Sequence, residues 1–329
     1  YYEKMMGVFS GTENYDIVMV AGHLWMADFI KKGYLAEIRY DEEDILPVIA
    51  DEMKFSGKNY LSPSFCDGHM IVYRKSIVKE VLGKEPGMVI TPQEYIDTAK
   101  AISENRDLPA IAMKADSSEI FTDALPFLRM FGEDVYDAET TASACDKDGV
   151  IRGLEKYCKL KKYAVAGTDK YGNNEIAAAI KFKKTAMAVT WSGQLGVVYS
   201  EDCLDKEDLG FATFDTSWNV TWSFAVSENC RHKEEAEKLL TYLRSPEVDS
   251  IAGALSGAPV RKKSYLDGMD KYPWYQCQLE MIKNAKPLPK MDSAGVKHGF
   301  LYKEIAEAFA GRKSPGEAMR DAKSAIDKL

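Results

Sequence analysis

Short apolar runs recur along the chain, each bounded by polar residues. Residues 16–20 read Asp-Ile-Val-Met-Val, and similar runs cover 70–73, 110–113, 186–190 and 220–226. A continuous apolar run of this length is typical of a strand that is buried on both faces. The pattern therefore predicts five buried strands.

Helices with clear start signals lie between these runs. Thr91 and Glu94 form a capping box, with Pro92 at the first helical position, and apolar residues recur at helical spacing up to residue 102. Residues 314–317 repeat the device before a helix that we expect to run to residue 329.

A third helix is predicted from about Lys233. It places Ala236, Leu239, Leu240 and Leu243 on one face and ends before Ser245-Pro246, because the residue before proline disfavours the helical region.

The alternation of strands and helices predicts an α/β fold with mostly parallel sheets. A chain of 329 residues is long enough for about two domains. No long flexible linker separates two halves, so we expect the chain to cross between the domains on ordered strands.

Composition narrows the class of protein. Apolar residues make up 46% and charged residues 29%, which is a globular balance, and the net charge of −8 argues against a nucleic-acid partner. No apolar run approaches the roughly 18 residues that cross a bilayer. There is no signal peptide, and the first residues read as the start of a mature or truncated fragment.

Motifs for metal binding or catalysis are not found. The four histidines are widely scattered, and no two of the six cysteines form a C-x-x-C pair. We expect no metal, no cofactor and no catalytic residue. Most cysteines are expected to be small buried hydrophobes, with a disulfide between Cys145 and Cys158 left open. A glycosidase needs only two carboxylates, which one sequence cannot locate.

Several segments, taken in order, resemble the carbohydrate-type extracellular solute-binding proteins of ABC importers, the maltose-binding-protein-like family. They are Tyr15–Val20, Trp25–Asp28, Lys32–Leu35, Gly57–Pro63, Met70–Lys75, Thr91–Ala99, Phe182–Trp191, Gly257–Lys262 and residues 311–329. Two positions depart from the family pattern: Pro92 replaces a tryptophan, and Lys184 or Thr185 replaces a glycine. The ordered combination covers the whole chain.

The resemblance implies a two-lobed periplasmic-binding-protein-like fold with a hinge of crossover strands. One lobe would comprise residues 1–72 and 217–270, and the other 73–216 and 271–329. The family begins with a strand, a helix and a second strand that we do not find here, so the ligand contacts of that region cannot be assigned.

The resemblance also implies ligand-binding residues in the first lobe. Trp25 follows the first strand, where the family has a ligand loop, although it could equally pack under that loop. Phe65 and Asp67 precede the first crossover strand, and Asp67 matches an acidic sugar-binding position of the family. The alternative for Asp67 is a surface turn.

Four further residues complete the predicted site. Trp191 ends its strand next to Ser192-Gly193, which suits a tight turn near a ligand. Trp218 and Trp222 flank the second crossover, and their spacing of four places them on one face of an extended segment, one against the ligand and the other in the hinge or core. Arg261 could bind hydroxyls or a carboxylate, or could form an exposed salt bridge.

The resemblance implies a binding protein and not an enzyme. It would capture a carbohydrate, an oligosaccharide by preference, close by hinge motion and deliver the ligand to an ABC transporter permease. We expect a monomer that is extracellular, either a cell-surface lipoprotein or periplasmic.

Two alternatives stay open at this point. The ligand could be a polyamine, an iron chelate or a peptide, because tryptophan also attracts cations. The chain could instead be a secreted carbohydrate-active enzyme on a similar two-lobed frame.

Overall fold

A computed structural model describes residues 1–256 and 258–329 and divides them into two compact units. Unit 1 comprises residues 1–67, 220–272 and 289–295, and unit 2 comprises 68–219, 273–288 and 296–329. Strand β4 (Ser62–Arg74) and strand β9 (Asn219–Val226) both run across the division. Two of the five passages between the units therefore run on ordered strands, as predicted, whereas those at 272–273, 288–289 and 295–296 do not.

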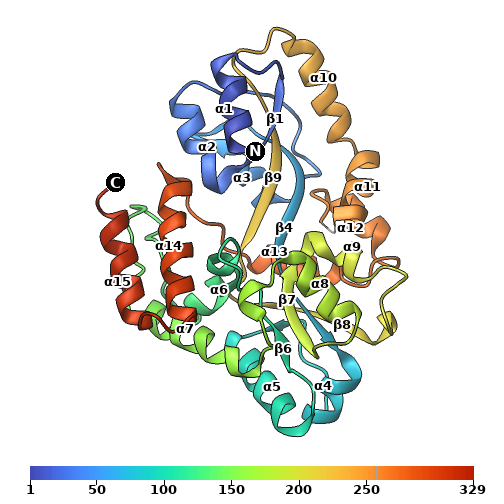
Figure 1. Ribbon diagram of the computed structural model, residues 1–329. Helices are drawn as coiled ribbons and strands as arrows, with labels where there is room; N and C mark the ends of the chain where they lie inside the picture. Colours follow the sequence, from blue (N-terminus) through green and yellow to red (C-terminus); the bar gives the residue numbers. More distant parts are fainter. Residues whose placement is uncertain (257) are drawn as a thin grey trace. The chain divides into compact units, whose positions relative to one another are not determined.

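Unit 1 packs helices against a strand pair. Strand β1 (Ile17–Ala21) runs antiparallel to β9, with Ile17 opposite Val226 and Ala21 opposite Trp222. Helices α1 (Tyr2–Ser10) and α2 (Gly22–Lys31) lie beside β1 (Figure 1) and share an apolar core with it. The other elements of this unit are α3 (Pro47–Glu52), β2 (Lys54–Phe55), β3 (Lys58–Asn59), α10 (Lys233–Leu243), α11 (Pro246–Ser256) and α12 (Lys262–Gly268).

Unit 2 is built on the second half of β4. This strand runs antiparallel to β7 (Met187–Trp191) and to β8 (Leu209–Phe214), while β6 (Ile111–Ala112) is parallel to β7 and β5 (Val89–Ile90) is parallel to β8. Its helices are α4 (Lys75–Leu82), α5 (Pro92–Asn105), α6 (Ile120–Leu128), α7 (Asp148–Leu160), α8 (Asn173–Lys181), α9 (Leu195–Val198), α13 (Tyr275–Asn284), most of α14 (Ala294–Phe309) and α15 (Pro315–Ile326).

The five predicted strands are confirmed, but the prediction of mostly parallel sheets is wrong. Both crossover strands pair antiparallel to neighbours within a unit, β9 with β1 and β4 with β7 and β8. A parallel pair follows when a helix returns the chain to the same edge, as in a βαβ unit. A strand that enters a unit from the other one has no such helix, so its direction is not constrained in this way.

The predicted helix starts are confirmed. Thr91 Oγ1 accepts from the Glu94 amide at 3.1 Å, and Glu94 Oε2 accepts from the Thr91 amide at 2.7 Å. Ser314 Oγ accepts from the Glu317 amide at 3.2 Å.

The apolar face predicted for α10 is only partly buried. Ala236 and Leu240 are buried, but Leu239 is 48% exposed. This helix of eleven residues packs on one side and buries only a narrow stripe, and Leu239 lies at the edge of that stripe.

Arg74, at the end of β4, joins three segments of unit 2. Its guanidinium donates to the carbonyl oxygens of Leu204 at 2.8 Å, Asp205 at 2.9 Å and Ile180 at 2.6 Å. The side chain is only 2% exposed, so these bonds replace water around a buried cation. Arg74 therefore fixes the loop before β8 to the end of α8.

The six cysteines are all free thiols, so the disulfide left open between Cys145 and Cys158 does not form. Five of the six are buried, as expected for small apolar side chains. Within residues 1–256 and 258–329, no helix combines the length and the apolar character that a membrane span needs.

Candidate functional site

Trp191 lies at the carboxyl end of β7, where it is directly opposite His69 of β4 in the sheet register. Its indole ring stacks on the His69 imidazole, with ring centres 4.8 Å apart, and meets Trp218 edge to face at 5.4 Å. Ligands of α/β sheets bind where loops converge at such strand ends. This aromatic group is therefore the first component of a candidate binding site in unit 2.

Two charged side chains contact the same indole ring. The Lys114 ammonium lies 3.7 Å from the ring centre, and Trp191 Nε1 donates to Glu119 Oε2 at 3.1 Å. Lys114 Nζ is also 3.8 Å from that carboxylate oxygen. Lys114 and Glu119 both lie in the loop between β6 and α6, so this one loop places both charges at the ring.

The exposure of these side chains differs sharply. Lys114 and His69 are 0% exposed and Trp191 is 8% exposed, while the Glu119 side chain keeps 23% of its surface. Glu119 is thus the charged member of this group that solvent or a ligand reaches most easily. A carboxylate accepts hydrogen bonds from hydroxyl or ammonium donors.

Burial shifts the titration of two neighbours. Burial lowers the pKa of His69 well below its ordinary value, and the nearby Lys114 charge acts in the same direction, so the imidazole is neutral at physiological pH. Burial raises the pKa of Asp123 to about 6, against the lowering effects of Lys114 and of a hydrogen bond from the Tyr157 hydroxyl at 2.8 Å.

The two tryptophans predicted around the second crossover belong to different units. Trp218 precedes β9 in unit 2, is 2% exposed and packs against Trp191 and His69. Trp222 lies within β9 in unit 1, opposite Ala21, and is half-buried. Trp218 is thus in contact with the Trp191 ring and nearly closed off from solvent.

The remaining aromatic candidates lie in unit 1. Trp25, on α2, is half-buried and stacks with Phe29, with ring centres 6.3 Å apart, at the border of the apolar core. Phe65 and Asp67, on β4, are both half-buried. Trp25 therefore packs against the core while part of its surface stays accessible.

Arg261 is held from several sides at the start of α12. Its Nε donates to the Arg244 carbonyl at 2.6 Å, its amide donates to Asp249 Oδ2 at 3.2 Å, and its guanidinium lies 3.6 Å from Asp44 Oδ2. A salt bridge is therefore present, but it is largely buried on the Arg261 side and not exposed as expected. Gly257, which opens the turn that resembles the family pattern, lies outside the described residues.

Lys114, Glu119 and His69 were missed by sequence reasoning. Lys114 and Glu119 bracket a polar stretch directly after the predicted strand 110–113, and attention to strand ends could have found them. The position of His69 gives no such signal, because this residue lies within β4 and not at the end of a strand.

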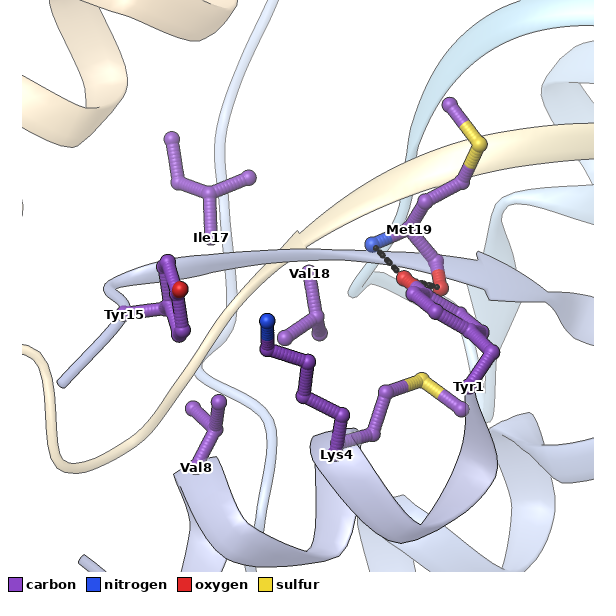
Figure 2. Close-up of a pocket in the computed structure, with 8 residues that line it drawn as sticks. Tyr1, Lys4, Val8, Tyr15, Ile17, Val18 and Met19 are labelled. Atoms are coloured by element: carbon purple, nitrogen blue, oxygen red, sulfur yellow. Dashed lines mark hydrogen bonds between the residues drawn. The ribbon is translucent and has the colours of Figure 1, made fainter. Parts of the chain in front are cut away.

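A separate cavity of about 230 Å³ lies between α1 and β1 in unit 1 (Figure 2). The Tyr1 hydroxyl donates to the Met19 carbonyl at 2.6 Å and accepts from the Met19 amide at 2.8 Å, so it satisfies the backbone at the edge of β1. Lys4 and Tyr15 also line the cavity, and none of the predicted ligand-binding residues does.

Comparison with known proteins gives the class. Residues 2–249 match the family described as bacterial extracellular solute-binding protein, and this match spans well over half of the chain. The chain belongs to this family of binding proteins, and the predicted resemblance is confirmed.

One relative of this chain is a probable amino-acid ABC transporter periplasmic-binding protein, y4oP of Sinorhizobium fredii. The two sequences are 22% identical over 272 residues. That alignment covers 80% of this chain but only 63% of the relative, so the chain spans less than two thirds of that protein's length.

Solved structures share the fold. Maltose-bound MalE3 of T. maritima has a TM-score of 0.88 at 19% identity, covering 100% of this chain and 88% of its own. The GacH receptor of Streptomyces glaucescens, solved unliganded and with acarbose, has 0.85 at 21%, covering 99% and 86%. A solute-binding protein of Agrobacterium vitis with bound D-mannitol has 0.83 at 19%, covering 99% and 87%. The predicted α/β solute-binding fold is confirmed.

Proposed function

We propose that this chain captures a carbohydrate or a polyol and delivers it to the permease of an ABC importer. The observation that carries the proposal is the Glu119 carboxylate, fixed at the edge of Trp191 by the indole N–H and beside the Lys114 ammonium. An oriented carboxylate next to a large aromatic side chain suits the hydroxyl groups and the C–H surface of a sugar.

The ligands of structurally similar proteins support this class. The similar structures hold maltose, acarbose, D-mannitol, α-D-tagatose and ribitol as ligands. All of these are polyhydroxylated molecules, although they differ in size and in ring form. The proposal therefore specifies a hydroxyl-rich ligand and leaves its length open.

The ligand contacts are also part of the proposal. We assign Glu119 and Trp191 in unit 2, and Trp25, Phe65, Asp67, Trp222 and Arg261 in unit 1. Trp218 would act behind Trp191. The two lobes would follow the predicted ranges 1–72 with 217–270 and 73–216 with 271–329, and closure around the hinge strands would remove water from the ligand.

An amino acid is the second candidate ligand, because the curated relative is named as a probable amino-acid binding protein. The oppositely charged Lys114 and Glu119 lie 3.8 Å apart, and such a pair could rearrange to bind the carboxylate and the ammonium of a zwitterion. This arrangement would require the ligand to replace an existing contact, which the carbohydrate proposal does not.

Location and assembly complete the proposal. The family is extracellular, and the natural protein would be either a lipid-anchored surface protein or periplasmic. It would act as a monomer without catalysis. Light scattering after size exclusion measures the first property, and incubation with oligosaccharides followed by product analysis measures the second.

A thermal-shift screen against monosaccharides, oligosaccharides, polyols and amino acids tests the function. A ligand at 100 times its dissociation constant adds about 2.7 kcal/mol to the free energy of unfolding. Glu119→Gln should raise the Kd of the hit about 10- to 100-fold, since a charged hydrogen bond contributes about 1.5–3 kcal/mol. The exposed Glu139→Gln is the control. Binding of amino acids alone, or unchanged affinity in Glu119→Gln, would contradict the proposal.

A further inference from the structure

The Lys114 ammonium is an unusual component for a site that binds neutral sugars. Its side chain is 0% exposed, and a buried lysine loses the hydration that stabilises its charge. The Trp191 ring, 3.7 Å from the ammonium, and Glu119, 3.8 Å away, both contribute to the compensation. The cation therefore interacts with both side chains of unit 2 that we assign to ligand binding.

Both polar contacts of Glu119 in this group use one oxygen. Trp191 Nε1 and Lys114 Nζ each approach Oε2, at 3.1 Å and 3.8 Å. Oε1 lies outside these two contacts, on a side chain that keeps 23% of its surface. The carboxylate can therefore accept a hydrogen bond from a ligand while its charge stays balanced by Lys114.

A second carboxyl lies within the influence of the same cation. Asp123 is 3% exposed, and Lys114 is the main charge that lowers its pKa, against burial that raises it to about 6. At neutral pH the charge of the ammonium thus interacts with two carboxylates, Glu119 and Asp123. The imidazole of His69 adds no charge, because burial keeps it neutral.

We propose that Lys114 determines which ligand charge this part of unit 2 accepts. The inference rests on the proposed function, because it takes Glu119 and Trp191 as ligand contacts. With Lys114 present, the charge of Glu119 is balanced and an uncharged hydroxyl-rich ligand is accepted. Without Lys114, the carboxylates of Glu119 and Asp123, which have little contact with water, lose the positive charge that balances them. A cationic ligand then gains affinity relative to a neutral one, and an acidic ligand loses affinity.

The test uses a charge series of whichever ligand the screen returns: the neutral compound, its carboxylate analogue and its amino analogue. Kd values are measured by calorimetry for the wild type, Lys114→Met, Lys114→Arg and the exposed-surface control Lys328→Met. In Lys114→Met we expect the Kd of the neutral ligand to rise about tenfold. Relative to the wild type, the Kd of the acidic ligand divided by that of the neutral ligand should rise about tenfold. The Kd of the amino ligand divided by that of the neutral ligand should fall. Lys114→Arg should keep the wild-type ratios.

Glu119→Gln supplies the opposite sign and does not depend on whether Lys114→Met folds. It removes the negative charge 3.8 Å from the ammonium, so the ratio of acidic to neutral Kd should fall below that of the wild type. Equal weakening of all three ligands in Lys114→Met, or unchanged ratios in Glu119→Gln, would overturn the role of Lys114 alone. A wild-type protein that binds no member of any ligand class would refute the proposed function and this role with it.

Discussion

Asp249 organises the turn that carries Arg261, and its removal gives a stability change that can be worked out from the structure. The carboxylate is 2% exposed on α11 and accepts from the Val260 amide at 2.9 Å, the Arg261 amide at 3.2 Å and the Ser264 hydroxyl at 2.6 Å. The two amide donors lie directly before α12, and Ser264 lies in its first turn. Asp249 thus ties the segment that enters α12 to α11.

Asp249→Ala should lower the free energy of unfolding by about 3 kcal/mol. Three hydrogen bonds at about 1–1.5 kcal/mol each give the gross loss. Burial raises the pKa of Asp249, which shows that the charged group also costs some desolvation, and removing it returns part of the loss. Ser264→Ala removes one of the three bonds and should cost about 1 kcal/mol.

Urea unfolding followed by tryptophan fluorescence and by circular dichroism measures the change. Because the two units can unfold separately, the transition must be assigned first, and Trp25 and Trp222 report unit 1. The exposed Asp270→Ala, in the same unit, is the control and should stay within about 0.5 kcal/mol of the wild type. An Asp249→Ala protein as stable as that control would show that the carboxylate does not hold the turn.

Three further outcomes are expected. Arg74→Met should cost about 3–5 kcal/mol in urea unfolding, because it strips a buried cation from three carbonyl oxygens; a loss below about 1 kcal/mol would contradict the assigned contacts. The free energy of unfolding should fall as pH drops below about 6.5, by up to about 1.4 kcal/mol per pH unit from His69, because the unfolded state binds a proton there that the folded state does not. Asp123 acts oppositely between about pH 4 and 6, since its pKa is raised, so His69→Gln should flatten the profile and Asp123→Asn should steepen it; profiles unmoved by either variant would reject these assignments. Thiol titration should detect at most about one reactive cysteine in the native protein and six after unfolding, because five of the six are buried; several fast-reacting native thiols would contradict that burial.

Much of the fold could be predicted because its signals are local. The run at 16–20 and the capping box at Thr91 depend on residues a few positions apart, and both appear where they were expected. The direction of β4 within its sheet is not local. It depends on a partner more than a hundred residues away, Trp191 opposite His69, and so the parallel prediction was wrong.

The candidate site divides in the same way. Trp191 was found because it ends a recognisable strand, but its interactions come from Lys114 and Glu119, which precede it by more than 70 residues and carry no motif. There was also no sign in the sequence that Trp218 and Trp222 belong to different units, because the division between the units falls between them. Charge and residue type identify candidates, whereas the pairing of distant loops decides which of them meet.

The discontinuous make-up of unit 1 has a consequence for how the protein is made on the ribosome. Ile17 of β1 must wait for Val226 of β9 before it can pair, and residues 289–295 complete the unit later still. At about 5–20 residues per second, the delay between synthesis of the two strands is roughly 10–40 s. During that time the apolar residues of β1 lack the strand partner that they have in the folded protein, and unit 1 cannot be completed before its last segment has been made.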